Sequence, residues 1–381
     1  MKTERLFDTD AFIFSFEAQV LSCEKQGKYY AAVLDKTAFF PEGGGQPADK
    51  GTLGGESVCD VQEREGIIYH YVKAPLGGTV QGVLDSNTRF CRMQNHSGEH
   101  VVSGIIHRLT GADNISFTLT DSETTLAFNV PLSEEMLAGV EREANDVVFR
   151  DVPISAYYPD SESLAALDYR SKLELSENVR LVEIAGTDLC ACCAPHCRTT
   201  GQIGLIKIVA SERYKGGTKL WIHCGSRALA HYALLLDEVT EISHLLCARA
   251  DKIAPAVQKL KESKEQAEYT LVSLKRKAIE ERIAGVPATE GNIVLRCDFQ
   301  GDDLRLFAEG LKAKAGGFVL VCAGDDTSAY RFVLTAAQRD IMPLVQPANA
   351  ALGGRGGGRD NMVRGTYAAP WQAIKQFFEN Q

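Results

Sequence analysis

The stretch RFCRMQNHSGEHVVSGIIHRLTG, residues 89–111, is the part of the chain from which its architecture is best worked out. Its composition predicts a helix, and Gly111 stands where helices commonly end. His96 and His100 are four residues apart. On a helix they therefore share one face, with side chains about 6 Å apart. The sequence on either side has a different pattern, so we expect separate domains around this helix.

Residues 1–88, before the helix, have the pattern of β structure. Segments such as AFIFSFEAQVLSC and GIIYHYV are short, alternate in part, and are separated by Gly, Asp, Glu or Pro. Several such strands predict a small β-barrel domain. The motif TAFFPEGGGQPADKG, residues 37–51, interrupts them. Its three consecutive glycines indicate a close approach of the backbone or a turn that needs positive φ.

After the helix, residues 89–228 predict an α+β domain, with strand-like sequence over 115–130 and a second helix over 132–149. Residues 229–290 predict a helical spacer. Apolar residues at 4-3 spacing from Ile253 to Ala278, interrupted by Lys264, are typical of a coiled coil. Pro255 should begin or kink this helix and leave a separate helix before it.

Residues 291–381 alternate between strand and helix patterns and predict a small α/β domain, in which the Gly/Arg-rich segment 353–365 is a loop. The fold class expected for the whole chain is therefore α+β and multidomain: a β-barrel, an α+β zinc-binding domain, a coiled-coil spacer and a C-terminal α/β domain.

Composition narrows the function classes. The 381 residues are 45% hydrophobic and 24% charged, which is typical of globular proteins. The net charge of −9 argues against a generally basic nucleic-acid coat but permits a local basic patch. No apolar run reaches 18 residues, and the sequence MKTERLFDTDAF lacks a signal-peptide core, so we expect a cytoplasmic protein with no membrane partner.

The eleven cysteines favour metal binding over a disulfide framework, because their number is odd and four of them crowd into residues 190–197. Cys192 and His196 repeat the four-residue spacing. With the first histidine pair they make a His₃Cys set that is typical of tetrahedral zinc: His96, His100, Cys192 and His196. Spacing alone leaves Cys190 or Cys193 open in place of Cys192, and a buried cluster of free cysteines is the plain alternative.

Two acidic residues beside this set are candidates for catalytic or supporting roles. HSGEH matches the HxxEH pattern, in which Glu99 would be a general base. Alternatively, Glu99 precedes His100 by one residue and so points about 100° away from it, toward solvent or a basic partner. Asp188 could accept a hydrogen bond from a ligand imidazole or could cap a turn.

Five motifs, in this order, give the chain a resemblance to a known family: TAFFPEGGGQPADKG (37–51), MQNHSGEHVVSGI (93–105), DYRSKLEL (168–175), DLCACCAPHCRTTGQIGLIKI (188–208) and GGRGGGRDNM (353–362). The sequence resembles the freestanding alanyl-tRNA editing proteins in their long form. These proteins resemble the editing and C-terminal domains of alanyl-tRNA synthetase.

The resemblance implies a zinc-dependent trans-editing hydrolase, with Zn²⁺ at the four residues named above. Its reaction would be hydrolysis of the ester that joins a wrong amino acid, serine or also glycine, to alanine tRNA. Thr37 would recognise the serine hydroxyl, and the glycine motif would border the substrate through Gly43, Gly44, Gly45 and Gln46. One departure is visible. The synthetases carry Gly-Gly-Thr between the Cys and the His, whereas this chain has Cys193-Ala194-Pro195.

With this resemblance, the tail is expected to offer a second contact for the same partner, mischarged alanine tRNA. Glycine backbone and arginine can hold phosphates, which makes Arg355, Arg359 and Arg364 candidate tRNA-binding residues; a plain surface loop is the alternative. A homodimer through the coiled coil or the C-terminal domain stays open.

Two other functions compete with the editing hypothesis. A zinc peptidase of the HxxEH type would need a carboxylate ligand and has no use for the Cys192–His196 pair. A non-catalytic RNA-binding protein with a structural zinc would have no turnover. Synthetase activity is not expected, since 88 residues before the helix are too few for an aminoacylation domain. The sequence leaves open whether zinc activates water or only positions substrate, and which group is the general base.

Overall fold

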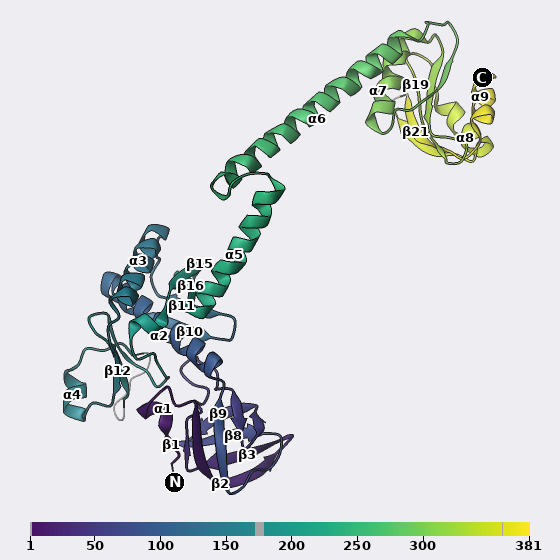
Figure 1. Ribbon diagram of the computed structural model, residues 1–381. Helices are drawn as coiled ribbons and strands as arrows, with labels where there is room; N and C mark the ends of the chain where they lie inside the picture. Colours follow the sequence, from purple (N-terminus) through teal and green to yellow (C-terminus); the bar gives the residue numbers. More distant parts are fainter. Residues whose placement is uncertain (1, 172–178, 360) are drawn as a thin grey trace. The chain divides into compact units, whose positions relative to one another are not determined.

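The computed structural model describes residues 2–171, 179–359 and 361–381. The chain folds into two compact units, Met1–Glu241 and Ile242–Gln381 (Figure 1). Helices and strands mix in both, so the predicted α+β, multidomain class is confirmed. The division falls inside helix α5 (Ser226–Leu245), and the four finer domains predicted from the sequence stay predictions. Part of the motif 168–175, namely 172–175, lies outside the described residues.

A seven-stranded antiparallel sheet begins the first unit, in the order β6-β5-β9-β2-β3-β8-β7. The end strands β6 (Glu56–Val58) and β7 (Asp60–Arg64) are separated only by Cys59, whose N–H donates to the Tyr71 carbonyl at 2.8 Å. The sheet is thus a nearly closed barrel, as predicted. Its other strands are β2 (Ser15–Gln26), β3 (Tyr29–Leu34), β5 (Gly51–Leu53), β8 (Ile67–Val72) and β9 (Thr79–Leu84).

A short segment precedes the barrel. Strand β1 (Glu4–Arg5) pairs in parallel with β4 (Lys36–Thr37), and helix α1 (Leu6–Thr9) follows β1. The barrel interior is filled by aromatic and aliphatic side chains, among them Leu34, Phe39 and Ile68, all fully buried. Ala194, from the cysteine-rich segment, is part of the same cluster. The barrel core therefore reaches the segment that carries the candidate metal ligands.

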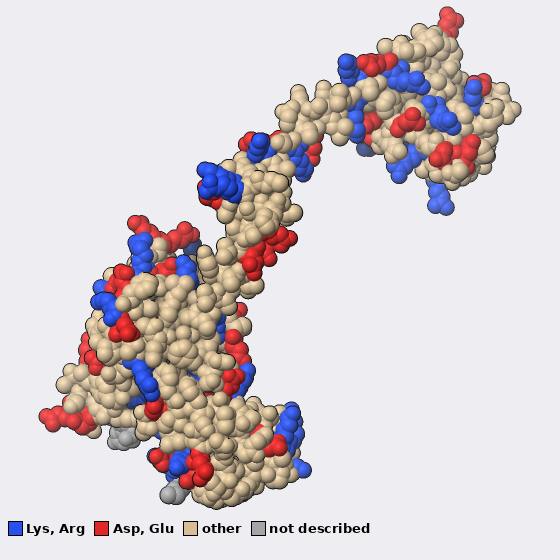
Figure 2. Space-filling model, in the orientation of Figure 1, with Lys and Arg blue, Asp and Glu red and all other residues tan. Residues whose placement is uncertain are grey.

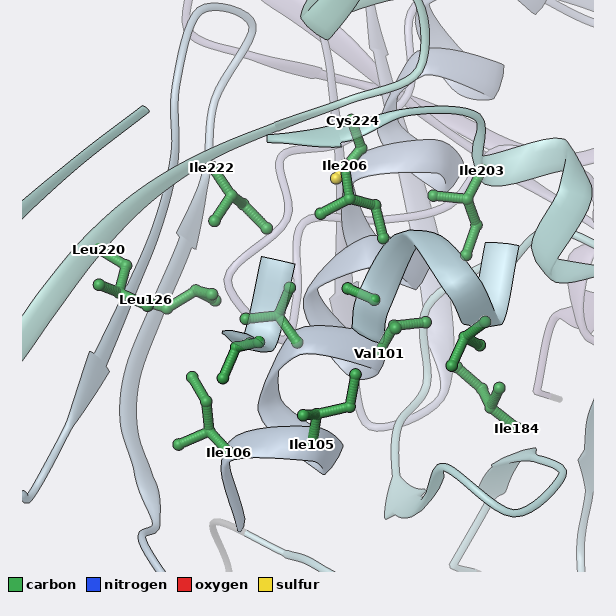
Figure 3. Packing of buried hydrophobic residues seen from close by; sticks show 14 of the residues in the cluster. Val101, Ile105, Ile106, Leu126, Ile184, Ile203, Ile206, Leu220, Ile222 and Cys224 are labelled. Atoms are coloured by element: carbon green, nitrogen blue, oxygen red, sulfur yellow. The ribbon is translucent and has the colours of Figure 1, made fainter. Parts of the chain in front are cut away.

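Helix α2 (Ser86–Thr110) is the predicted central helix, and it begins three residues earlier than residue 89 because Asp85 caps it. The Asp85 carboxylate accepts from the Thr88 N–H at 3.0 Å, and Gly111 ends the helix at φ 69°. Figure 3 shows Val101, Ile105 and Ile106 of α2 packed toward the apolar side chains of the neighbouring sheet. Every residue from 92 to 106 is buried, so α2 also carries its polar side chains into the interior.

Two smaller sheets complete the first unit. One has the order β10-β11-β16-β15, made of β10 (Asn114–Leu119), β11 (Thr124–Phe128), β16 (Gly217–Cys224) and β15 (Ile206–Tyr214). The other, not predicted from the sequence, has the order β12 (Ile154–Tyr157), β13 (Leu181–Ile184) and β14 (Asp188–Ala191). The second predicted helix is α3 (Glu134–Arg150); α4 (Ser161–Ala166) and the 3-10 turn η1 (Thr200–Ile203) are short.

The second unit contains the long helix α6 (Ile253–Ala284), which follows α5 and the turn η2 (Ala250–Lys252). Pro255 is its third residue, so the predicted break before it is confirmed. The apolar seam is 49–59% exposed at Val257, Leu260, Leu271 and Leu274. The coiled coil therefore stays a prediction. No helix among the residues that the structure describes is long and apolar enough to cross a membrane.

A five-stranded sheet closes the second unit, in the order β17 (Ile293–Cys297), β18 (Phe318–Ala323), β19 (Tyr330–Ala336), β21 (Met362–Tyr367) and β20 (Arg355–Arg359). Around it lie α7 (Asp302–Leu311), the turn η3 (Lys312–Lys314), α8 (Met342–Ala351) and α9 (Trp371–Glu379) (Figure 1). Much of the segment expected as a loop is the hairpin β20–β21. Its glycines permit this close pairing, because a Cβ on Gly365 would lie 2.3 Å from the Arg355 carbonyl oxygen.

Candidate metal centre and its surroundings

The structure brings the four predicted ligands together. One donor atom from each of His96, His100, Cys192 and His196 lies within 4.8 Å of all the others. The two α2 histidines meet the loop after β14, where Cys192 Sγ is 3.5 Å from His96 Nε2 and 3.3 Å from His196 Nε2. All three imidazoles are buried. This donor set fits a single metal ion, and imidazole with thiolate is a combination that suits zinc.

Each of the three imidazoles is also held from behind. The Nδ1 atoms have these partners: Gln46 Oε1 at 2.9 Å from His96, Asp188 Oδ2 at 2.9 Å from His100, and Ser97 Oγ at 3.0 Å from His196. Ser97 Oγ accepts in addition from the Cys197 N–H at 3.1 Å. Because the amide oxygen and the carboxylate can only accept, Nδ1 carries the proton in His96 and His100. Nε2 is therefore the atom left for a metal.

The electrostatics favour a thiolate at Cys192. Burial alone would raise the pKa of this thiol, but its interactions with the surrounding imidazoles of His96, His196 and His100 hold its pKa well below the usual range. Burial also lowers the pKa of His196 to about 3. A metal requires a thiolate and neutral imidazoles of its ligands. The pKa directions of Cys192 and His196 agree with this, whereas the bond to Asp188 outweighs burial and raises the pKa of His100 well above its usual range.

The neighbouring thiols are placed differently. Cys190 groups with His100 and Asp188 rather than with the other histidines. Burial raises the pKa of Cys190 to about 11, whereas Cys193 is exposed. Cys193 lies beside the glycine motif, where a Cβ on Gly44 would be 3.7 Å from its sulfur. Among the described residues, the geometry thus groups Cys192 with the three histidines.

Asp188 accepts hydrogen bonds from Arg170 as well as from His100. It begins β14, its side chain is almost fully buried, and it is gripped by Arg170 through Nε to Oδ1 at 2.7 Å and Nη2 to Oδ2 at 2.8 Å. Two parallel bonds of this kind fix the plane of a carboxylate. Sequence reasoning assigned no role to Arg170, although it lies inside one of the five motifs.

Glu99 is buried and does not face solvent, at 5% exposure. Its Oε1 accepts from Ser103 Oγ at 2.7 Å and from Asn114 Nδ2 at 2.6 Å. Its Oε2 lies 3.8 Å from His100 Nε2, the atom that faces the centre. The carboxylate thus stands beside the ligand cluster, held by two side chains that sequence reasoning did not single out.

The glycine motif forms a tight turn next to the centre. Gly43 and Gln46 exchange two backbone hydrogen bonds at 3.0 Å, and Gly44 and Gly45 have φ of 59° and 81°. The Gly45 carbonyl accepts from the Leu119 N–H at 2.8 Å, which ties the turn to β10. A pocket of about 610 Å³ lies alongside, lined in part by Gly43, Gly45, Gln46 and Arg92. The turn places the Gln46 side chain within hydrogen-bond distance of His96.

Thr37 lies inside the barrel and is fully buried. Its Oγ1 is 2.8 Å from His70 Nε2 and accepts from the Phe39 N–H at 3.1 Å. Burial lowers the pKa of His70 to about 4, so this imidazole is neutral at pH 7. His70 Nδ1 lies 3.2 Å from the Ala32 carbonyl and donates to it, so Nε2 must accept from Thr37. A lone histidine in a strand gave no sequence signal for this pair.

Arg355, Arg359 and Arg364 lie in the second unit and are exposed. Arg355, Gly357 and Arg359 are every second residue of β20. Gly357 pairs directly with Arg364 on β21. Since paired residues and alternate residues share a face, all three arginines lie on one face of the hairpin. Figure 2 shows basic and acidic side chains interspersed on the visible face of both units, without a continuous basic band there.

Comparisons with known proteins find similarity to tRNA synthetase and alanyl-tRNA editing sequences. Residues 179–219 match the threonyl and alanyl tRNA synthetase second additional domain, and residues 7–88 match the class II (A) tRNA synthetases. The chain is 27% identical to an alanyl-tRNA editing protein, AlaX-L, of Pyrococcus horikoshii, over 97% of this chain and 96% of that protein.

Alanine–tRNA ligases match as well, at 31% identity in Pyrobaculum calidifontis and 28% in Methanococcus maripaludis strain C5. Both alignments cover 98% of this chain but only 44% and 43% of the ligases. The chain thus spans less than half the length of these ligases and nearly the full length of the editing protein. The resemblance drawn from the five motifs is confirmed: the chain is similar to an alanyl-tRNA editing protein over nearly its whole length, and to part of the alanine–tRNA ligases.

Proposed function

We propose that this protein is a trans-editing hydrolase that removes serine, and also glycine, from mischarged alanine tRNA at a zinc site. The observation that carries the proposal is the His₃Cys cluster with each imidazole held through Nδ1, in a chain that resembles an alanyl-tRNA editing protein over 97% of its length. The substrate is an aminoacyl ester on the terminal ribose of the tRNA.

His96, His100, Cys192 and His196 would hold the zinc. The bound ion would supply positive charge that polarises the ester carbonyl or orients the amino group of the substrate. Gln46, Asp188 and Ser97 keep the three imidazoles in the orientation that presents Nε2. Four protein ligands form a closed set, which favours a positioning role for the ion over generation of hydroxide.

Glu99 is the proposed proton acceptor for the attacking water. Asn114 and Ser103 hold its Oε1, so its Oε2 has a set direction on the side of His100 Nε2. In the reaction, water would add to the ester carbonyl and give its proton to Glu99. The bond between the acyl carbon and the ribose oxygen would then break, and that oxygen would take the proton back from Glu99 and leave as a hydroxyl. Thr37 is the proposed contact for the serine hydroxyl.

The tail is proposed to bind the body of the tRNA. The three arginines on one face of the β20–β21 hairpin have the fork geometry that suits phosphate oxygens. The protein would act in the cytoplasm, where charged tRNA is found.

The zinc peptidase alternative is disfavoured by the donor set. A third, carboxylate ligand would be needed, yet Asp188 binds His100 through Nδ1 and is occupied by Arg170, and Cys192 with His196 fills the other positions. A non-catalytic RNA-binding protein with a structural zinc uses the same donors. Only turnover separates it from the editing enzyme.

The deciding experiment is deacylation of Ser-, Gly- and Ala-charged alanine tRNA by the purified protein, before and after treatment with a chelator. We expect rapid loss of serine, slower loss of glycine, little loss of alanine, and recovery of activity when zinc is returned. Zinc-loaded protein that releases none of the three amino acids would favour the structural-zinc alternative.

A further inference from the structure

We infer that Arg170 is a positioning residue of the metal centre, which acts through Asp188 to set the orientation of His100. The inference rests on the proposed zinc site, and it adds a residue that neither the motif spacing nor the ligand set identifies. It concerns the zinc affinity of the protein in the absence of tRNA.

The contacts form a chain that runs from the protein backbone to the centre. The Arg170 N–H donates to the Leu189 carbonyl and the Ala191 N–H donates to the Arg170 carbonyl, both at 2.9 Å, so Arg170 is paired along β14. Its guanidinium then grips both oxygens of Asp188, and Oδ2 receives His100 Nδ1–H at 2.9 Å. The backbone pairing with β14 positions Arg170, Arg170 orients Asp188, and Asp188 orients His100.

Without Arg170, Asp188 would lose the two bonds that fix its plane. The carboxylate would also lose the cation that balances its charge in a buried site, and a buried charge without a partner is costly. Oδ2 could then rotate away from the line to His100 Nδ1. The imidazole would lose its fixed direction, and with it part of the pre-organisation that metal affinity requires.

The geometry distinguishes arginine from lysine at this position. A guanidinium makes two parallel bonds to one carboxylate, whereas an ammonium is a point charge on a flexible stem. Arg170→Lys should therefore keep charge balance but lose the fixed plane. Arg170→Gln should lose both.

The test is the zinc affinity of full-length variants, measured by competition with a chromophoric chelator. Loss of a hydrogen-bond partner behind a ligand histidine typically costs 10–100-fold in metal affinity, and we expect Asp188→Asn to fall in that range. Arg170→Gln should lose about 10-fold, at the lower end of that range because it acts through a second residue, and Arg170→Lys should lie between Arg170→Gln and the wild type. Arg108→Gln is the matched control, since Arg108 pairs with Glu143 at the surface end of the same helix, α2.

A double-mutant cycle separates a positioning role from a general structural one. If Arg170 acts through Asp188, Arg170→Gln should cost nothing further in the Asp188→Asn background. The absorption of bound cobalt(II) should keep its tetrahedral pattern in all variants. Zinc affinity of Arg170→Gln equal to that of Arg108→Gln, or an equal loss in both backgrounds, would overturn the inference. Should Arg170→Gln not fold, Arg170→Lys replaces it in the same cycle. A wild type that binds no zinc would instead contradict the proposed site itself.

Discussion

The ligand histidines show how single residues acquire a role from their surroundings. His96, His100 and His196 each use Nδ1 for a fixed partner and Nε2 for the centre. Replacing His96 or Cys192 by alanine should remove much of the bound zinc, because only three of the four protein ligands remain in either variant. Cys190→Ala and Cys193→Ala are the matched controls and should keep it. Elemental analysis of the four purified variants measures this, and full retention in His96→Ala and Cys192→Ala would refute the assignment.

Thr37 supports a prediction on selectivity. Thr37→Val removes the hydroxyl proposed to meet the serine side chain and leaves His70 Nε2 without its 2.8 Å partner. An unpaired buried polar group costs about 1–3 kcal/mol. Relative to the wild type, we expect the deacylation of Ser-tRNA to slow more than the deacylation of Gly-tRNA. We also expect the variant to have a lower free energy of unfolding. Thr37→Ser keeps a hydroxyl and should retain both properties. Equal slowing with both amino acids would show that Thr37 only packs in the barrel.

His70 links stability to pH. Its pKa is about 4 in the folded protein and 6.5 as the reference value, so the unfolded chain binds the proton more readily. The stabilisation from keeping this imidazole neutral is present above pH 6.5 and is lost as the pH falls toward 4, by up to about 3 kcal/mol. Urea unfolding at several pH values should show this decline. The His70→Gln variant, which cannot titrate, should show a smaller decline over the same window.

At the scale of elements, the glycine turn is held against β10 by the hydrogen bond from the Leu119 N–H to the Gly45 carbonyl. Gly45 combines φ of 81° with a site where an added Cβ would lie 2.6 Å from the Phe117 carbonyl oxygen, so Gly45→Ala should push the turn off β10 and move Gln46 away from His96. Gly55 has φ of 86° and open space around its Cβ position, which makes Gly55→Ala a control for backbone strain alone. Zinc affinity and deacylation should both fall in Gly45→Ala and stay near the wild type in Gly55→Ala. If the two variants fell alike, strain rather than contact would be the cause.

At the scale of the whole molecule, every ligand candidate lies in the unit Met1–Glu241, whereas the arginine hairpin lies in Ile242–Gln381. A chain cut after Glu241 should keep zinc and hydrolyse a charged minihelix. It should bind full-length tRNA more weakly and with a shallower salt dependence, since phosphate contacts are lost. Exchanging Arg355, Arg359 and Arg364 for alanine should reproduce part of the loss without changing turnover at saturating substrate. If the cut chain bound full-length tRNA as tightly as the intact one, the second unit would have another role, with dimerisation the first candidate.

Local patterns in the sequence were enough to predict most of the helices and strands. Alternation predicted the barrel strands, the four-residue spacing placed His96 and His100 on one helix face, and Pro255 marked the break before α6. These features depend on residues a few positions apart, which periodicity and turn chemistry report directly. The sheet β12-β13-β14 and the Gly/Arg segment were exceptions. In the Gly/Arg segment, the β20–β21 pairing depends on how closely glycines let two backbones approach, a contact that a loop-like composition conceals.

Only the tertiary structure decided what surrounds the ligands. The partners of His96, His100 and His196 are 50, 88 and 99 residues away in the chain, and the grip of Arg170 on Asp188 spans 18. Glu99 is buried because the middle of α2, residues 92–106, is enclosed by other parts of the first unit, which no helical periodicity could show. Contacts of this kind form when distant segments pack, and their donors and acceptors are paired because leaving them unpaired in the interior would cost free energy.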